Sequence, residues 1–231
     1  MEELRQGLLR AVQLIASLDP EVVAITTRSL AISATSCSLA TLIAIPLGSL
    51  IHFTRFSGKR ALVSVIQTLF SLPTVVVGLL VFVLFSRAGP WGGLDIMFTP
   101  TVMVIGQVIL ILPLMLGLVI SALSGVDKAV PETAVSLGAN RLQTAVLTLR
   151  EARYAVLTAV IMGFGRALSE VGLALMVGGN IRGFTRTLTT AISLETSKGE
   201  IELSLALGII LLLIALAINV TLNRLQRRYG E

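Results

Sequence analysis

Five long stretches of this 231-residue chain are almost free of charge, and they constrain its fold more than any other feature. They cover residues 30–51, 61–86, 96–126, 154–179 and 203–222, and only the fourth contains charged residues, Arg166 and Glu170. A helix of about 20 apolar residues crosses the hydrocarbon core of a bilayer. Because backbone polar groups must find partners inside that core, runs of this length predict helices. We therefore expect an all-α integral membrane protein with five transmembrane helices.

The composition agrees with a protein whose outer wall faces lipid. Charged residues make up 13% of the chain, whereas soluble domains contain about 25%. The net charge of +5 comes from basic residues grouped between the apolar runs, which is typical of loops at a membrane surface and does not indicate a nucleic-acid partner. With one cysteine, Cys37, and one histidine, His52, we expect no internal disulfide, metal site, cofactor or catalytic centre.

The first 20 residues differ from the rest of the chain. Between residues 4 and 18, apolar side chains recur on one helical face, and Asp19-Pro20-Glu21 then interrupts the pattern. Those apolar positions are Leu4, Leu8, Val12 and Ile15. The segment is too short to span a bilayer, so it predicts an interfacial helix in contact with membrane lipid over residues 1–20. Residues 21–231 then form a single transmembrane domain.

Lysine and arginine placement predicts the orientation of the five spans. The segments after the first, third and fifth spans contain ten basic residues, and the opposite side contains seven. Because basic loops stay in the cytoplasm, we expect a multi-pass protein with its N-terminus outside and its C-terminus cytoplasmic. Pro73 and Pro113 lie inside the second and third runs. We interpret them as ordinary bends, with a moving hinge as the alternative.

The loop at about 125–150, between the third and fourth spans, carries the most informative pattern. Pro131 suits the first turn of a helix, Glu132 and Thr133 favour its positive end, and Gly138 can end it in a left-handed conformation. The residues predict a short helix at the cytoplasmic membrane face, with Ala134, Val135 and Leu137 as a small apolar surface. Such a helix could dock into a partner or pack on its own chain.

This run, E-T-A-x-x-x-G-A, resembles the E-A-A-x-x-x-G loop of ABC importer permeases. The resemblance implies a type I importer permease (MetI-like) fold in a bacterial or archaeal inner membrane. It also implies a homodimer with two ATP-binding subunits and an extracytoplasmic substrate-binding protein. The implied coupling residues are Glu132, Thr133, Ala134, Gly138 and Ala139.

Two further features bear on the branch of that family. The family motif continues into I-x-L-P, where this chain has Thr148, Arg150 and Glu151, so we expect a continuous helix from about residue 142. The runs L-R-E-A-R at 149–153, G-G-N-I at 178–181 and T-R-T-L-T-T-A-I at 185–192 resemble the tungstate permeases. The molybdate permeases are also similar, and they share Glu170 and the Gly179-Asn180 pair. The resemblance therefore implies tungstate uptake, with molybdate, sulfate or another ligand as alternatives.

Arg166 and Glu170 are four residues apart, so they share one face of the fourth helix. Intramembrane charges are costly unless they are paired or face water. They form either a structural ion pair, which we favour, or part of a pathway or gate together with Asn180. An intramembrane enzyme is the distant alternative, but Ser169 has no histidine nearby in sequence. The chain has no G-x-x-x-x-G-K-[ST] motif, so we expect a transporter subunit whose partner hydrolyses ATP.

Overall fold

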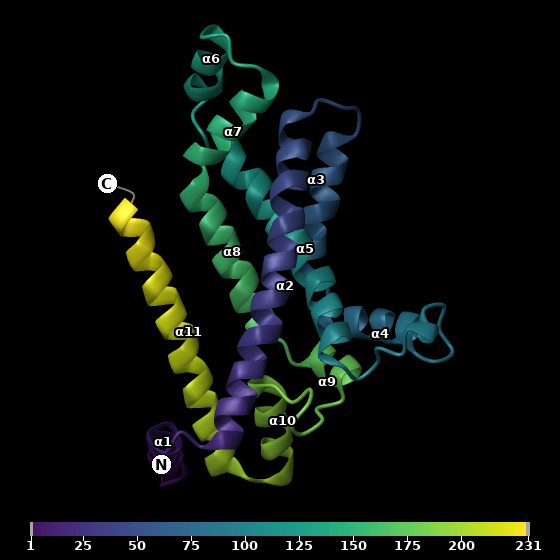
Figure 1. Cartoon of the computed structure of the whole chain (residues 1–231), viewed down its shortest axis with the longest axis vertical. Helices are drawn as coiled ribbons and strands as arrows, with labels where there is room; N and C mark the ends of the chain where they lie inside the picture. Colours follow the sequence, from purple (N-terminus) through teal and green to yellow (C-terminus); the bar gives the residue numbers. More distant parts are fainter. Residues whose placement is uncertain (1, 230–231) are drawn as a thin grey trace.

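The computed structural model describes residues 2–229, which form helices and no strand (Figure 1). In chain order the elements are α1 (Glu2–Ala16), α2 (Pro20–Phe53), α3 (Lys59–Thr68), η1 (Leu69–Ser71), α4 (Thr74–Phe85), η2 (Gly92–Leu94), α5 (Pro100–Ser124), α6 (Ala129–Ser136), α7 (Arg141–Glu151), α8 (Arg153–Leu168), α9 (Gly172–Gly178), α10 (Leu188–Lys198) and α11 (Ile201–Tyr229). Three helices, α2, α5 and α11, are long and apolar enough to span a membrane. The number rises to five when each of two bent helix pairs counts as one span.

The second and fourth predicted spans are broken rather than straight. The run at 61–86 folds as α3 with η1 and then α4, bent by 97° around Pro73. Pro73 has no N–H to donate and disfavours helical backbone at Leu72, whose ψ is 122°. The chain bends at Pro73 as we predicted, but the bend is a sharp corner that ends one helix and begins another. By contrast, α5 continues through Pro113.

The centre of the molecule is a bundle of α2, α5 and α8. Small side chains of α2 let α5 and α8 approach closely, and four of them are buried: Ser33, Ser36, Cys37 and Ala40. On α8, a Cβ added to Gly163 would lie 2.7 Å from Sδ of Met115 in α5. These small residues hold the three helices at a close spacing that larger residues would prevent.

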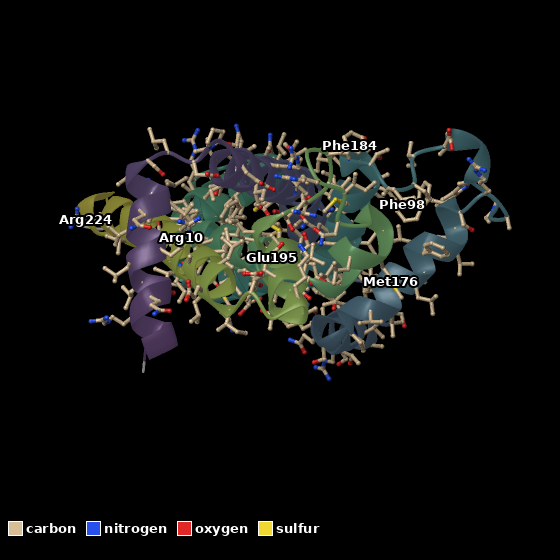
Figure 2. All side chains as sticks on the ribbon, turned by 90° about the horizontal axis from the view of Figure 1, so that it is seen from below. Arg10, Phe98, Met176, Phe184, Glu195 and Arg224 are labelled. Carbon is tan, nitrogen blue, oxygen red and sulfur yellow. The ribbon has the colours of Figure 1, made fainter. Side chains whose placement is uncertain are left out.

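The two ends of the molecule differ in architecture (Figure 1). At one end, which we call the α6 end, α6 and α7 connect α5 to α8. At the opposite end, the α10 end, α1 packs on the start of α11 and α10 lies beside it. Figure 2 views the molecule onto this α10 end, with Arg10 of α1 and Glu195 of α10 labelled near its surface. A helix is thus present where we predicted the interfacial segment.

The helices α4 and α11 carry large apolar side chains on their exposed faces. Among the described side chains these include Val75, Val76, Leu79, Leu80 and Phe82 of α4, and Leu212, Leu213 and Leu216 of α11. Faces of this composition suit contact with lipid or with another apolar protein surface. The α4 helix also projects away from the bundle (Figure 1), and its inner face packs on α9 through Val77 and Val81.

Candidate functional site

The short helix α6 forms as its local sequence predicts. Asp127 accepts a hydrogen bond from the Ala129 N–H at 2.9 Å, and Pro131 lies in the first turn. Gly138 adopts φ +85°, in the left-handed region. Its N–H donates to the Val135 carbonyl, and the Ala139 N–H donates to the Ala134 carbonyl, both at 2.9 Å. These two bonds satisfy the terminal carbonyls of the helix in a Schellman motif, so the predicted glycine cap is confirmed.

The side chains of α6 are divided between the chain itself and the exterior. Ala134 is buried where α6 packs on α7. Val135 is 60% exposed and Leu137 is 83% exposed, although both are apolar. Glu132 and Thr133 are exposed on the same short helix. Apolar side chains held this far out on a rigid element are typical of a docking surface.

After this loop the chain continues through α7 and α8, which together form nearly the continuous helix that we predicted. Asn140 and Gln143 form a reciprocal capping box at the start of α7, which fixes the direction of the chain after the glycine turn. The helices α7 and α8 are separated by Ala152 alone, which has a helical backbone. The structure therefore interrupts the expected helix at one residue and otherwise bears it out.

The intramembrane charges Arg166 and Glu170 form an ion pair at the break between α8 and α9. The distance from Arg166 Nη1 to Glu170 Oε2 is 3.0 Å, and the side chains are 33% and 1% exposed, respectively. The other carboxylate oxygen, Oε1, accepts the Leu173 N–H at 2.9 Å. Glu170 therefore also caps the first turn of α9, where backbone N–H groups lack helical partners. Both oxygens of Glu170 are thus engaged within the chain, and Arg166 keeps a third of its side chain accessible.

Further polar contacts hold the same break in place. The Thr189 hydroxyl of α10 donates to the Glu170 carbonyl at 2.7 Å, and Gln107 of α5 donates to the Ala167 carbonyl at 3.2 Å. Asn180 donates to the Thr190 carbonyl at 3.2 Å. The first turn of α10 thus contacts both Glu170 and Asn180. Among the hydrogen bonds and ion pairs of the described residues, none joins Asn180 to Arg166.

The sequence did not point to Gln107 or Thr189, or to the capping bond of Glu170. An acidic residue just before a helix can accept its unpaired first N–H groups, but the surrounding apolar run masked the helix break. Among residues 2–229, no group of three or more His, Cys, Asp or Glu side chains could hold a metal ion. His52 instead lies 3.2 Å from the Ser124 hydroxyl through Nδ1.

Comparison with known proteins decides the family. Residues 44–231 match the family described as the binding-protein-dependent transport system inner membrane component. The chain belongs to this family. It is 39% identical over 226 residues to the tungstate uptake system permease protein TupB of Peptoclostridium acidaminophilum, covering 98% of this chain and 99% of that protein. It is 32% identical over 177 residues to the molybdenum transport system permease protein ModB of Escherichia coli K12, covering 71% of this chain and 77% of that protein.

Solved structures of importers share this fold. The MetNI methionine ABC transporter in an inward-facing conformation matches with a TM-score of 0.73 at 18% identity, covering 92% of this chain and 97% of that chain. A bacterial alginate ABC transporter in complex with a periplasmic protein also gives 0.73, at 19% identity, covering 90% of this chain and 79% of that chain. The predicted importer-permease fold and membership in a transport family are confirmed, whereas the roles of individual site residues stay predictions.

Proposed function

We propose that this chain is the membrane-spanning permease of an ABC importer for tungstate. The observation that carries the proposal is the full-length similarity to a tungstate uptake permease. The match covers 98% of this chain and 99% of that permease. Molybdate and sulfate are also tetrahedral dianions, and they are the alternatives that the experiment below separates.

The α6 end is our proposed contact for the ATP-binding subunit, with two such subunits serving two copies of the permease. The exposed apolar side chains Val135 and Leu137 would enter an apolar groove on that subunit. The Gly138 cap and the Asn140 capping box make α6 a stiff connection to α5 and α8. Movement of the bound ATPase would therefore be transmitted to the helix that carries Arg166. Glu132, Thr133 and Ala139 complete this coupling loop.

A second copy of the chain would complete the anion pathway along α8. The exposed face of α8 presents Ala155, Thr158, Met162 and Gly165 at spacings of three or four, and the exposed Ser169 follows the helix. Apart from Met162, these are small or weakly polar residues. This face differs from the exposed Leu-, Val- and Phe-rich faces of α4 and α11, which suit lipid. A cavity of about 550 Å³ opens between α5 and this face near Ala155 and Thr158. Two such faces would enclose a water-accessible route, with Arg166 and Asn180 near it.

The orientation that we propose places the α6 end in the cytoplasm and the α10 end outside. The basic segments around α6 and after α2 support it. The N-terminal helix α1 would then lie in the outer interface, where its exposed Leu8, Leu9, Val12 and Ile15 contact lipid. The extracytoplasmic binding protein would approach the α10 end, and α11 would run from there toward the cytoplasm (Figure 1).

Uptake by cells tests this proposal. The chain would be expressed with its neighbouring ATP-binding and binding-protein subunits in cells that lack their own oxyanion importers. Tungsten accumulation would be measured at submicromolar tungstate with molybdate or sulfate as competitors. We expect ATP-dependent tungsten accumulation that sulfate does not suppress. Accumulation that molybdate or sulfate abolishes at equal concentration would instead assign the transporter to that anion.

A matched pair of variants separates coupling from folding. Leu137→Asp should abolish co-purification of the ATP-binding subunit and uptake, because a charge would enter an apolar groove. The control is Leu18→Asp, which changes another strongly exposed leucine, at the α10 end between α1 and α2. It should leave both measurements unchanged. Normal uptake by Leu137→Asp would show that α6 is not the coupling element.

A further inference from the structure

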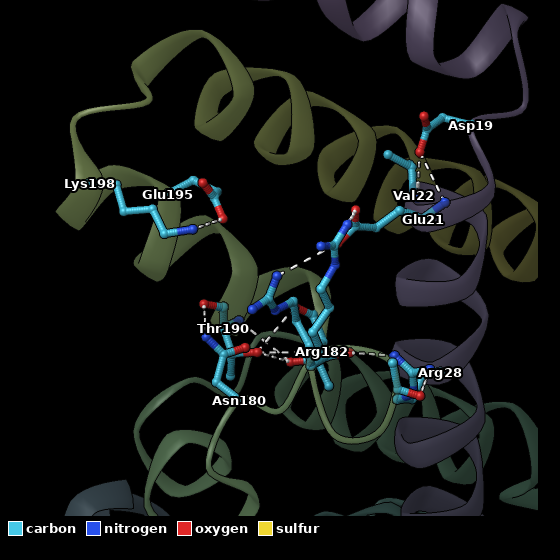
Figure 3. Close-up of polar contacts among 12 residues, drawn as sticks. Asp19, Glu21, Val22, Arg28, Asn180, Arg182, Thr190, Glu195 and Lys198 are labelled. Carbon is cyan, nitrogen blue, oxygen red and sulfur yellow. Dashed lines mark hydrogen bonds and ion pairs between the residues drawn. The ribbon is translucent and has the colours of Figure 1, made fainter.

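A cluster of arginines at the α10 end converges on a single carboxylate (Figure 3). Glu21, in the first turn of α2, accepts hydrogen bonds on both oxygens from Arg182, with the Arg182 Nε to Oε1 distance at 2.9 Å. Arg186 Nη1 lies 3.7 Å from the same Oε1. Both arginines belong to the loop between α9 and α10. One negative charge thus serves two guanidinium groups.

The loop does not depend on Glu21 for its position. Arg28 of α2 donates to the carbonyls of Gly183 at 2.7 Å and Arg186 at 3.1 Å. Inside the loop, the Thr185 hydroxyl donates to the Gly178 carbonyl and accepts the Ile181 N–H. Because these bonds pin the loop to α2 and to the end of α9, the contact of Glu21 with the two arginines is free to serve another purpose.

The surroundings leave this site short of negative charge. A cavity of about 320 Å³ next to Glu21 is lined by four basic side chains, Arg10, Arg182, Arg186 and Lys198, and by three acidic ones, Asp19, Glu21 and Glu195. Glu195 pairs with Lys198 at 3.0 Å, and the Asp19 carboxylate accepts the N–H groups of Glu21 and Val22. Glu195 and Asp19 therefore already have partners other than the two arginines. Among the described side chains, Arg186 is 14% exposed and its Nε is buried without a hydrogen-bond partner.

We propose that Arg182 and Arg186 form an oxyanion-binding fork in which the Glu21 carboxylate takes the place of the anion. This inference rests on the proposed function, and it adds a binding site in the permease itself. Guanidinium groups bind planar carboxylates and tetrahedral oxyanions through the same paired N–H geometry. A tetrahedral dianion offers four oxygens and two charges, so it satisfies both arginines better than one carboxylate does. Its arrival displaces Glu21 and releases the bridge between α2 and the loop, while Arg28 keeps the loop in place.

Equilibrium dialysis of the permease without the binding protein tests this site. The permease and its ATP-binding subunit would be purified together in nanodiscs, and bound tungsten would be measured by mass spectrometry across a tungstate titration. Glu21→Gln removes the competing carboxylate but keeps its size, so we expect tungstate affinity to rise about tenfold. Arg182→Gln and Arg186→Gln should each lower it about tenfold. Sulfate should compete in this assay, which lacks the binding protein, since the fork itself recognises any tetrahedral dianion.

Controls distinguish this site from general charge effects. Glu202→Gln and Arg87→Gln change an acid at the start of α11 and an arginine after α4, both outside the cluster, and they should bind tungstate as the unmodified protein does. Weaker or unchanged binding by Glu21→Gln would overturn the proposal, because a purely structural ion pair predicts no gain. The proposal would also be overturned if Arg182→Gln and Arg186→Gln kept their tungstate affinity and lost only the ability to bind the substrate-binding protein. Uptake by the complete transporter with no tungstate bound in dialysis would refute this site and leave the proposed function standing.

Discussion

The double role of Glu170 leads to a quantitative prediction about the break between α8 and α9. Its carboxylate pairs with Arg166 through Oε2 and caps the Leu173 N–H through Oε1. Replacing Arg166 and Glu170 together by methionine removes both charges but leaves a buried N–H unpaired, which costs about 1–3 kcal/mol. Arg166→Met with Glu170→Gln also removes both charges but keeps an oxygen for Leu173, so it should be nearly neutral. Glu170→Ala alone should cost about 3 kcal/mol or more, because it also strands Arg166.

Thermal unfolding of the purified protein measures this order. For a chain of 150–250 residues, 1 kcal/mol shifts the unfolding midpoint by about 2–4 °C, so the methionine pair should unfold roughly 2–12 °C below the Arg166→Met, Glu170→Gln variant. The Glu170→Ala variant should be the least stable. Equal midpoints for the two double variants would refute the capping role. A stable Glu170→Ala variant would refute the structural pair as well.

The same variants separate the pair from the pathway. If the pair is only structural, the Arg166→Met, Glu170→Gln variant should fold and import at a normal rate. If the Arg166 charge serves the passing anion, that variant should fold, bind its ATPase and import nothing. Tungsten accumulation at matched membrane levels of the two proteins gives the answer. The second outcome would make Arg166 a transport residue even though its partner is Glu170.

Three further predictions concern the coupling loop, the α10 contact and the topology. Gly138→Val should cost about 1–2 kcal/mol at φ +85° and reduce ATPase co-purification. Gly138→Asn, which tolerates this conformation, should retain it, and equal behaviour of the two would contradict the cap. Thr189→Val leaves the buried Glu170 carbonyl without its 2.7 Å bond and should lower stability by about 1 kcal/mol, seen as a lower unfolding midpoint. In a Cys37→Ser background, cysteine at the exposed Gly93, where an added Cβ meets nothing within 4 Å, should react with an impermeant thiol reagent on intact cells, whereas cysteine at Asn140 should not. Labelling at Asn140 from outside would reverse the proposed orientation.

Several features of this molecule follow from local sequence because their physical causes are local. A bilayer forces each apolar run to satisfy its own backbone, so the runs at 30–51, 96–126 and 203–222 predicted α2, α5 and α11 without knowledge of their neighbours. The end of α6 at Gly138 is equally local, since only a residue that tolerates positive φ can close that turn. The pairing of Arg166 with Glu170 follows from one helical turn of separation.

Other features depended on contacts that apolar periodicity does not encode. The 97° corner at Pro73 and the 58° bend after α8 lie where α4 and α9 pack on each other. Pro73 and the charged residues Arg166 and Glu170 mark these places in the sequence, but they do not reveal how sharply the chain turns. The bond from Thr189 to Glu170 and the bond from Gln107 to Ala167 join different helices. Glu21 and Arg182 are 161 residues apart. Their meeting required α2 and the α9–α10 loop to be folded against each other, so only the tertiary structure could bring these charges to one site.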